Sequence, residues 1–333
     1  MPQGKKKKKP AAKKEASPKK TAPAGKGDKT AAKKSSGEMT PLQARGLIES
    51  EMAKISRLLE GKNFESIEEA QELLDGIIGG GGTTPELKPE TPLDKAQELV
   101  YDAWQASGRE RVKLAKKALG ICPDCADAYV ILAEESGGNL LEVLEFFRSG
   151  AKAGERALGP DYFEEDVGHF WGIVETRPYM RARLGLAMVL WEVGKQVEAV
   201  KHLQDMLRLN PGDNQGIRYI LASRLLMMDR DEELMELLDS YEDEPTACWS
   251  YTRALLSYRR EGATGRSLKI LKEALRRNPH VPAYLLRKRK LPDEPPHHIG
   301  FGDETEAIEY AFDFLLPWSL TPGALDWLGD AAG

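Results

Sequence analysis

The sequence predicts an all-α fold in which helical hairpins repeat every 34 residues. Pro211, Pro245 and Pro279 stand 34 residues apart. Each follows a segment in which apolar residues recur with helical spacing. Two of the three prolines follow asparagine, and because proline cannot continue a helix, each of them closes a unit.

A 34-residue period that ends in proline is typical of the tetratricopeptide helix-turn-helix repeat. Such repeats stack into a solenoid that presents a concave binding surface. We therefore predict an all-α, tetratricopeptide-like solenoid with a disordered basic N-terminal tail. The 41% hydrophobic and 30% charged residues agree with a helical protein that has a highly charged exterior.

Residues 1–37 form a lysine-rich tail with 13 lysines and two acidic residues. The tail has no aromatic or branched aliphatic side chain, so we expect it to be disordered. Because the whole chain carries −5 and the tail +11, the rest of the chain carries −16. Basic tails bind nucleic acid weakly and without base specificity; a tail that is merely solvated, or that contacts anionic lipid, is the alternative. The predicted polyanion-binding lysines are Lys5, Lys6, Lys7, Lys8, Lys9, Lys13, Lys14, Lys19, Lys20, Lys33 and Lys34.

Residues 38–78 are predicted to form a small helical hairpin. Pro41 suits the first turn of its first helix, and Gly61 suits the end of that helix. Ser66 and Glu69 have the spacing of a capping box that opens the second helix. Residues 79–92 are rich in glycine and proline and are predicted to be a linker.

Residues 93–303 are predicted to hold the repeats, with an insert among them. The interval from Pro123 to Pro211 is 88 residues, which exceeds two 34-residue repeats by 20. The surplus falls in residues 154–177, where aromatic and acidic side chains are mixed. Long loops without regular structure are usually functional or disordered. We expect the insert to be a partner-binding loop or a plug of the groove.

Residues 304–333 are predicted to form capping helices, at about 304–316 and 324–328. The ends of a solenoid need such atypical helices because the last repeat would otherwise expose its apolar face.

The concave groove is the predicted partner site, since the first helix of each hairpin lines it. Arg181, Arg218 and Arg253 fall at groove-facing positions, where guanidinium groups can hold a peptide carboxylate through paired hydrogen bonds. Pairing with acidic side chains of neighbouring units is the favoured alternative. Trp191 and Trp249 are predicted apolar anchors, with packing between repeats as the favoured alternative.

The sequence gives no positive sign of an enzyme, so we predict no catalytic residue, no cofactor and no metal site. Cys122 and Cys125 form a C-x-x-C pair, but they lie at a turn between helices rather than after a strand. Zinc would need two further ligands, and His280, His297 and His298 are far away in the sequence.

The sequence also predicts a cytoplasmic location. No apolar run approaches the ~18–20 residues that span a bilayer. No apolar stretch follows the N-terminal lysines, as a secretory signal requires, and three cysteines do not make a disulfide framework.

Several stretches resemble the suppressor-of-tumorigenicity-seven family, and in particular its soluble microbial relatives. The most specific are residues 278–286 (NPHVPAYLL) and 302–311 (GDETEAIEYA), with support from 118–135, 175–183 and 210–219. The resemblance covers roughly residues 93–329. It implies a repeat-containing protein without established catalytic residues. Eukaryotic members look membrane-embedded through N-terminal apolar segments, which this chain does not have, so that location is not carried over.

The function we predict is a noncatalytic scaffold that binds a peptide or helix of another protein in the concave groove. The alternative is a nucleic-acid- or ribosome-associated adaptor that is anchored by the basic tail.

Overall fold

The computed structural model describes residues 39–59, 66, 68, 69, 71, 72, 75, 76, 89 and 91–333. Every regular element in these residues is a helix, and they contain no strand, which confirms the predicted all-α class. The tail 1–37, most of the second helix of the predicted 38–78 hairpin and most of the 79–92 linker lie outside the described residues. Ser66 Oγ does accept a hydrogen bond from Glu69 N at 3.3 Å, as the predicted capping box requires.

Helix α1 (Pro41–Leu59) begins at the predicted proline and packs against α3 (Pro92–Gln105). The two helices come close at Gly46, where a Cβ atom would stand 3.3 Å from the Cβ of Trp104. Helix α3 opens with a capping box between Thr91 and Asp94, which satisfies two backbone N–H groups at its start.

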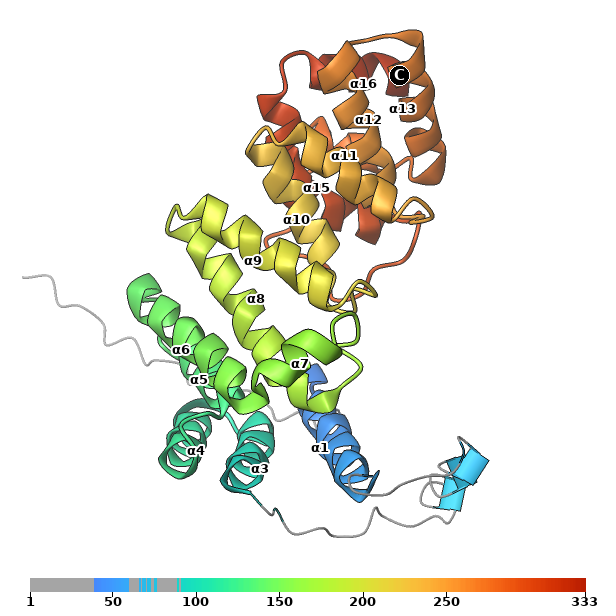
Figure 1. Cartoon of the computed structure of the whole chain (residues 1–333). Helices are drawn as coiled ribbons and strands as arrows, with labels where there is room; N and C mark the ends of the chain where they lie inside the picture. The colour runs from blue at the N-terminus through green and yellow to red at the C-terminus, as the bar shows by residue number, and fades with distance from the viewer. Residues whose placement is uncertain are drawn as a thin grey trace, which may run out of the picture. The chain divides into compact units, whose positions relative to one another are not determined.

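Three helical hairpins follow one another from α3 to α9 (Figure 1). They pair α3 with α4 (Gly108–Ile121), α5 (Ala126–Glu134) with α6 (Leu140–Leu158), and α8 (Arg177–Glu192) with α9 (Gln196–Leu209). The first helices also touch in series, α3 on α5 and α5 on α8. Small buried residues such as Ala128 and Ala182 let these first helices approach closely.

Two further hairpins follow α9. They pair α10 (Ile217–Met227) with α11 (Asp231–Ser240), and α12 (Ala247–Glu261) with α13 (Gly265–Arg277). Pro211, Pro245 and Pro279 each come shortly after the second helix of a hairpin, at the ends of α9, α11 and α13.

Residues 154–177 hold more regular structure than the predicted loop. Helix α6 continues to Leu158, α7 (Pro160–Glu165) follows it, and the 3-10 helix η1 (Val174–Thr176) leads into α8. Phe163 packs against Phe170 and Tyr179, with ring centroids 5.2 Å away in both cases. These aromatic contacts hold the segment on the hairpins, because they replace exposure of three large rings by mutual burial.

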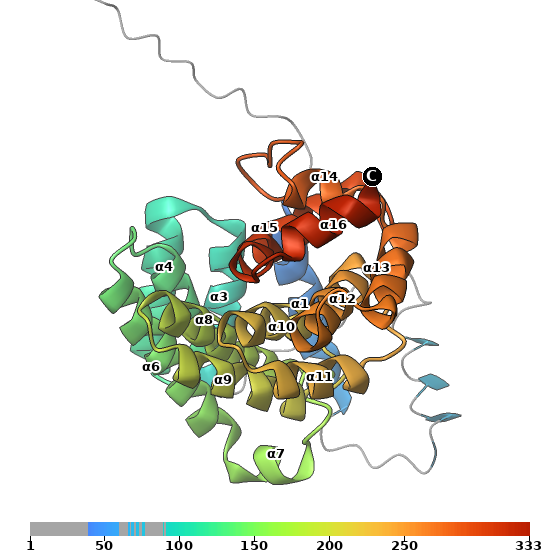
Figure 2. The same ribbon diagram turned by 90° about the horizontal axis from the view of Figure 1, so that it is seen from above.

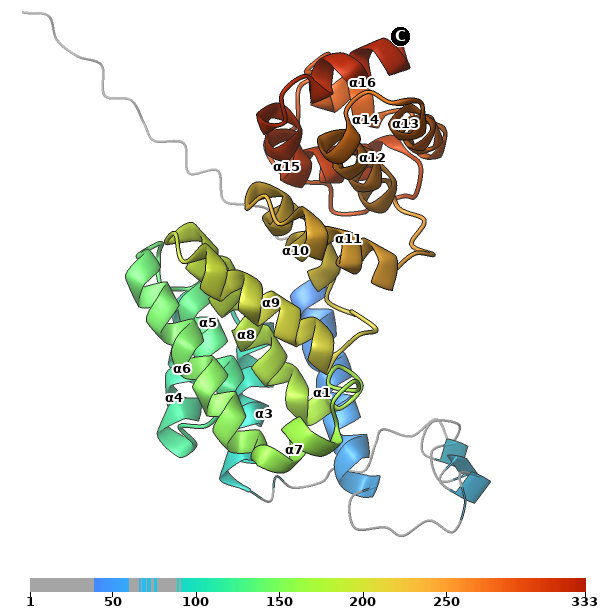
Figure 3. The same cartoon turned by 45° about the horizontal axis from the view of Figure 1, so that its top comes forward.

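The C-terminal helices are α14 (Val281–Leu285), α15 (Glu304–Leu320) and α16 (Ala324–Ala332). Helix α15 contacts α10 and α12 as well as α14 and α16, so it covers earlier hairpins in addition to the last one (Figures 2 and 3). It is four residues longer than predicted and continues through Pro317. Proline cannot supply the usual N–H to the carbonyl of Asp313. The hydroxyl of Ser223 on α10 donates to that carbonyl instead, at 3.0 Å.

None of the described helices has both the length and the apolar character that a bilayer crossing requires.

Candidate functional site

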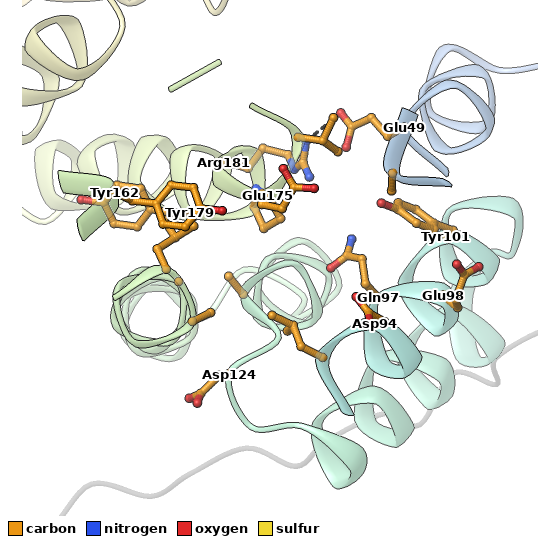
Figure 4. A pocket seen from close by; sticks show the side chains of 18 of the residues that line it. Glu49, Asp94, Gln97, Glu98, Tyr101, Asp124, Tyr162, Glu175, Tyr179 and Arg181 are labelled. Carbon is orange, nitrogen blue, oxygen red and sulfur yellow. Dashed lines mark hydrogen bonds and ion pairs between the residues drawn. The ribbon is translucent and has the colours of Figure 1, made fainter. Parts of the chain in front are cut away.

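Arg181 on α8 lies at the centre of a buried charge cluster that joins three helices. Its side chain forms a bidentate pair with Asp127 of α5, with Nε–Oδ1 at 2.8 Å and Nη2–Oδ2 at 2.6 Å. The third nitrogen, Nη1, donates to Glu49 Oε1 of α1 at 2.8 Å. Arg181 is 9% exposed and Asp127 0% exposed. The guanidinium also lies 5.0 Å from the ring centroid of Trp104 (Figure 4 shows Arg181 facing Glu49).

The cluster keeps its charges although it is buried. Burial alone would lower the pKa of Arg181, but the charges and hydrogen bonds of Asp127 and Glu49 together raise it, so the guanidinium stays protonated. Gln97 Nε2 of α3 donates to Asp127 Oδ2 at 3.0 Å and satisfies a further acceptor. A second pair, Arg57 to Glu98 at 3.0 Å, ties α1 to α3.

This arrangement defines a helix seat, by which we mean the surface of α3, α5 and α8 around Arg181 that receives α1. The sequence predicts that Arg181 holds the carboxylate of a bound peptide. In the structure Arg181 holds a carboxylate of the chain's own helix α1. Its paired hydrogen bonds go to Asp127 of the neighbouring α5–α6 hairpin, which is the favoured alternative of the sequence prediction.

A cavity of about 170 Å³ lies beside the helix seat. Tyr162 and Tyr179 stand on one side of it and Tyr101 on the other, with Glu175 between them (Figure 4). Burial raises the pKa of Tyr101, and raises that of Tyr179 to about 12, so both phenols stay neutral at physiological pH. Residues of the 154–177 segment, Tyr162 and Glu175 among them, wall this cavity, whereas the sequence left open whether the segment opens or closes a groove.

Arg218 and Trp249 lie together in a second cluster. Arg218 contacts Asp213 Oδ2 at 3.0 Å and Glu244 Oε2 at 2.5 Å, and its guanidinium lies 4.5 Å from the ring centroid of Tyr219. Trp249 is 1% exposed and meets Tyr219 edge-on at 5.5 Å. Arg218 is thus paired with acids that flank its own hairpin α10–α11, and not with acids of a neighbouring unit. Trp249 packs in the core, which is the alternative favoured for it. Trp249 is therefore a core residue and not an exposed anchor.

Arg253 and Trp191 are both partly buried. Arg253 lies beside Trp249, since both side chains donate to the carbonyl of Leu238 and both line one hollow. Arg253 Nη1 contacts Asp239 Oδ1 at 3.0 Å, and Nη2 donates to the carbonyl of Leu238 at 2.5 Å. Trp191 is half-buried, and the guanidinium of Arg224 lies 4.6 Å from its ring centroid. Each of the three arginines is thus paired with a carboxylate of the chain itself. The role of the five residues in binding a partner stays a prediction.

The C-x-x-C pair lies under the helix seat. Cys125 is fully buried, and its thiol contacts Gln97 Oε1 at 3.7 Å. Burial raises the pKa of Cys125 to about 12, which disfavours the reactive thiolate. No group of three or more histidine, cysteine or acidic side chains suited to a metal occurs in the part of the chain that the structure describes.

A second hollow, of about 260 Å³, lies between α15 and the hairpins beside it. Its lining includes Cys248, Phe301, Glu309 and Asp313. The sequence predictions did not include these residues. No local signal selects them, because α12, the loop before α15 and α15 are brought together only by tertiary packing.

Comparison with known proteins places residues 89–330 in a match to the family model "ST7 protein". The chain is 30% identical over 259 residues to "Suppressor of tumorigenicity 7 protein-like" of Gallus gallus, which covers 71% of this chain and 46% of that protein. The human protein of the same description is 31% identical, over 71% of this chain and 45% of its own length. "Protein ST7 homolog" of Drosophila melanogaster is 29% identical, over 69% and 47%. The chain spans about half the length of these animal relatives, and they give no support to a specifically microbial kinship.

Proposed function

This chain belongs to the ST7 protein family, as its sequence resemblance predicts, and we propose that it is a noncatalytic interaction scaffold. In this proposal the helical hairpins form a tetratricopeptide-like solenoid whose first helices hold a helical segment. The 34-residue period and the serial contacts of α3, α5 and α8 support the repeat architecture.

The observation that carries the proposal is α1 in the helix seat. A helix is received there by an arginine whose two partner carboxylates come from different helices, α5 and α1. A buried pair of this kind adds less to affinity than to the choice of partner and register, because desolvation offsets much of its attraction. The seat is therefore suited to select a helix that places a carboxylate opposite Arg181.

The proposal is tested with a labelled peptide of residues 39–59 and the full-length chain. The attached α1 competes at an effective concentration in the millimolar range, so the wild-type protein should bind the peptide poorly. Glu49→Lys places a second cation beside Arg181 and should displace the attached helix. We expect the Glu49→Lys protein to bind the wild-type peptide at least about tenfold more tightly than the wild-type protein does, measured by fluorescence anisotropy.

Glu51→Lys is the matched control because it makes the same charge change on the exposed side of α1. It should leave peptide binding at the wild-type level. Thermal unfolding shows whether each variant is folded. A folded Glu49→Lys protein that fails to bind the peptide would remove the helix seat as a binding surface.

The absence of catalysis is part of the proposal. It is supported by the contacts of two acidic groups beside the 170 Å³ cavity, since Glu49 and Glu98 are each paired with an arginine of the chain itself.

A second candidate function is an adaptor that contacts nucleic acid or the ribosome through the basic tail. It is favoured by the +11 charge of residues 1–37 against −16 on the rest of the chain. The two candidates differ in which segment they require, so deletion of the tail separates them.

A further inference from the structure

The outer face of α15 carries an uncovered apolar stripe. Phe312, Leu316 and Leu320 follow one another at intervals of four residues and therefore lie on one side of the helix. Leu316 is 54% exposed and Leu320 61% exposed. Phe301, in the loop before α15, is 77% exposed. Large apolar side chains that gather on one exposed face usually mark an interaction site.

Two carboxylates border this stripe. Glu309 and Asp313 are also four residues apart. They fall on the same side of α15 as Leu316 and Leu320, because residues three and four positions apart share one side of a helix. Neither forms an ion pair within the part of the chain that the structure describes. Burial raises the pKa of Glu309, and the neighbouring charge of Asp313 adds to this effect. A cation beside Glu309 and Asp313 would favour the ionised form of both carboxylates.

The face is hollowed where the acids and the apolar loop meet. Phe301, Glu309 and Asp313 all line the 260 Å³ hollow. Its other walls include Cys248 of α12 and Phe314 on the buried side of α15. A side chain of a partner can thus enter the hollow while its neighbours lie along the stripe.

We propose that this α15 face, made of Phe301, Glu309, Phe312, Asp313, Leu316 and Leu320, docks an amphipathic helix of a partner protein. That helix carries lysine or arginine opposite the two acids and leucine-like side chains opposite the stripe. Helices recognise such surfaces through anchors spaced three and four residues apart.

The charge and shape of the face argue against two other occupants. The lysine-rich residues 1–37 have no branched aliphatic or aromatic side chain to cover the stripe. A second copy of the chain, placed symmetrically, would set the same acidic patch against itself. A helix that is both basic and apolar meets both parts of the face.

The α15 face is a different surface from the helix seat. Its proposed partner rests on the scaffold function, since both surfaces are sites of noncatalytic binding. Its experiment uses variants of α15 and leaves Glu49 and Arg181 unchanged. Failure at the α15 face would therefore leave the peptide test of the helix seat unaffected, and the reverse also holds.

The test measures binding of a labelled synthetic helix to the full-length chain. The probe is an 18-residue leucine–lysine peptide with one apolar stripe, and a second peptide has glutamate in place of every lysine. We expect the lysine peptide to bind and the glutamate peptide not to bind. Leu316→Ser with Leu320→Ser, and separately Glu309→Lys with Asp313→Lys, should each weaken the lysine peptide at least about tenfold.

Matched controls separate this face from general attraction to an acidic protein. Leu141→Ser with Val197→Ser removes two other exposed apolar side chains, and Glu232→Lys with Glu236→Lys reverses another acidic pair four residues apart. Both control proteins should bind within about twofold of wild type. The Glu309→Lys, Asp313→Lys protein should in turn gain binding of the glutamate peptide.

Three results would overturn the proposal. One is that Glu232→Lys with Glu236→Lys weakens binding of the lysine peptide as much as Glu309→Lys with Asp313→Lys does, which would show general charge attraction. Another is equal binding of both peptides to wild type. The third is a wild-type dimer that Leu316→Ser with Leu320→Ser converts to a monomer in sedimentation, because a second copy would then be the occupant.

Discussion

Arg181 stabilises the fold because it neutralises a buried carboxylate, in addition to holding α1. Asp127 is fully buried, and Arg181 is the cation that contacts it. Removal of one partner from a buried pair leaves an uncompensated charge and costs about 3–5 kcal/mol. We expect Arg181→Ala to lose stability of that size in urea unfolding.

Glu49→Gln tests the same cluster more gently, because it leaves the bidentate pair of Arg181 with Asp127 intact. Its loss should be about 1 kcal/mol, as for one hydrogen bond. Equal losses for the two variants would contradict the central place of Arg181.

Asp313 makes the protein less stable as the pH rises, whereas carboxylates that are paired in the folded state have the opposite effect. Burial raises its pKa above the ordinary 3.8, although the charge of Arg224 acts in the opposite direction. The folded state therefore holds the proton more tightly than the unfolded state, and this group makes the protein less stable as the pH rises from about 3.8 through the folded pKa. Asp313→Asn should be more stable than wild type at pH 7.

The gain from Asp313→Asn should shrink below the ordinary carboxylate range, where both proteins are neutral at this position. Urea unfolding between pH 3 and 7 measures the difference. A gain that does not change with pH would assign the effect to packing and not to charge.

At the scale of the element, the close approach of α6 and α8 rests on glycine. A Cβ atom at Gly154 would stand 2.8 Å from the Cβ and 3.0 Å from the Cα of Tyr179, so backbone would have to shift. Overpacking of this kind costs about 1–3 kcal/mol. We expect Gly154→Ala to lower thermal stability by that amount.

Gly120→Ala is the control, since a Cβ atom at that helical position meets open space. It should be neutral or stabilise the protein by up to about 1 kcal/mol, because alanine favours the helix. The same loss at both positions would mean that the contact with Tyr179 is unimportant.

The boundaries of most helices could be predicted because local signals determine them. Pro41, Pro211, Pro245 and Pro279 mark starts and ends correctly, since a proline acts on its own backbone. Helix α15 continues through Pro317, past its predicted end at about residue 316. This continuation depends on the hydroxyl of Ser223, which satisfies the carbonyl of Asp313, 90 residues away.

The site could be predicted only in part, for the same reason. The sequence predicts that Arg181 binds a carboxylate. It does not predict that the carboxylate is Glu49, which lies 132 residues away and is one of many acidic residues in the chain. The favoured alternative, an acid from a neighbouring unit, is found for Arg181 with Asp127, whereas Arg218 pairs with Glu244, which follows its own hairpin. The α15 face was visible as apolar spacing, yet only tertiary contacts show which side of a helix is left uncovered.

At the scale of the whole molecule, charge is divided between the tail and the rest of the chain. A chain lacking residues 1–37 loses 13 lysines, and binding to phosphate polymers through them depends on counterion release. We expect full-length protein to be retained on immobilised RNA at low salt and to elute as salt rises. The truncated protein should pass through at every salt concentration.

Retention of the truncated protein would contradict the adaptor function and would place nucleic-acid binding on residues 38–333. A full-length protein that never binds would leave the scaffold as the remaining candidate.

The link between Glu49 and Arg181 also sets an order of events during synthesis. Helix α1 leaves the ribosome early, but the arginine that receives it follows 132 residues later. At about 5–20 residues per second this delay is about 7–26 s. Through that interval the nascent helix has no seat, so its apolar side chains are open to chaperones, and the docking of α1 can serve as the signal that the first two hairpins and the start of α8 have been made.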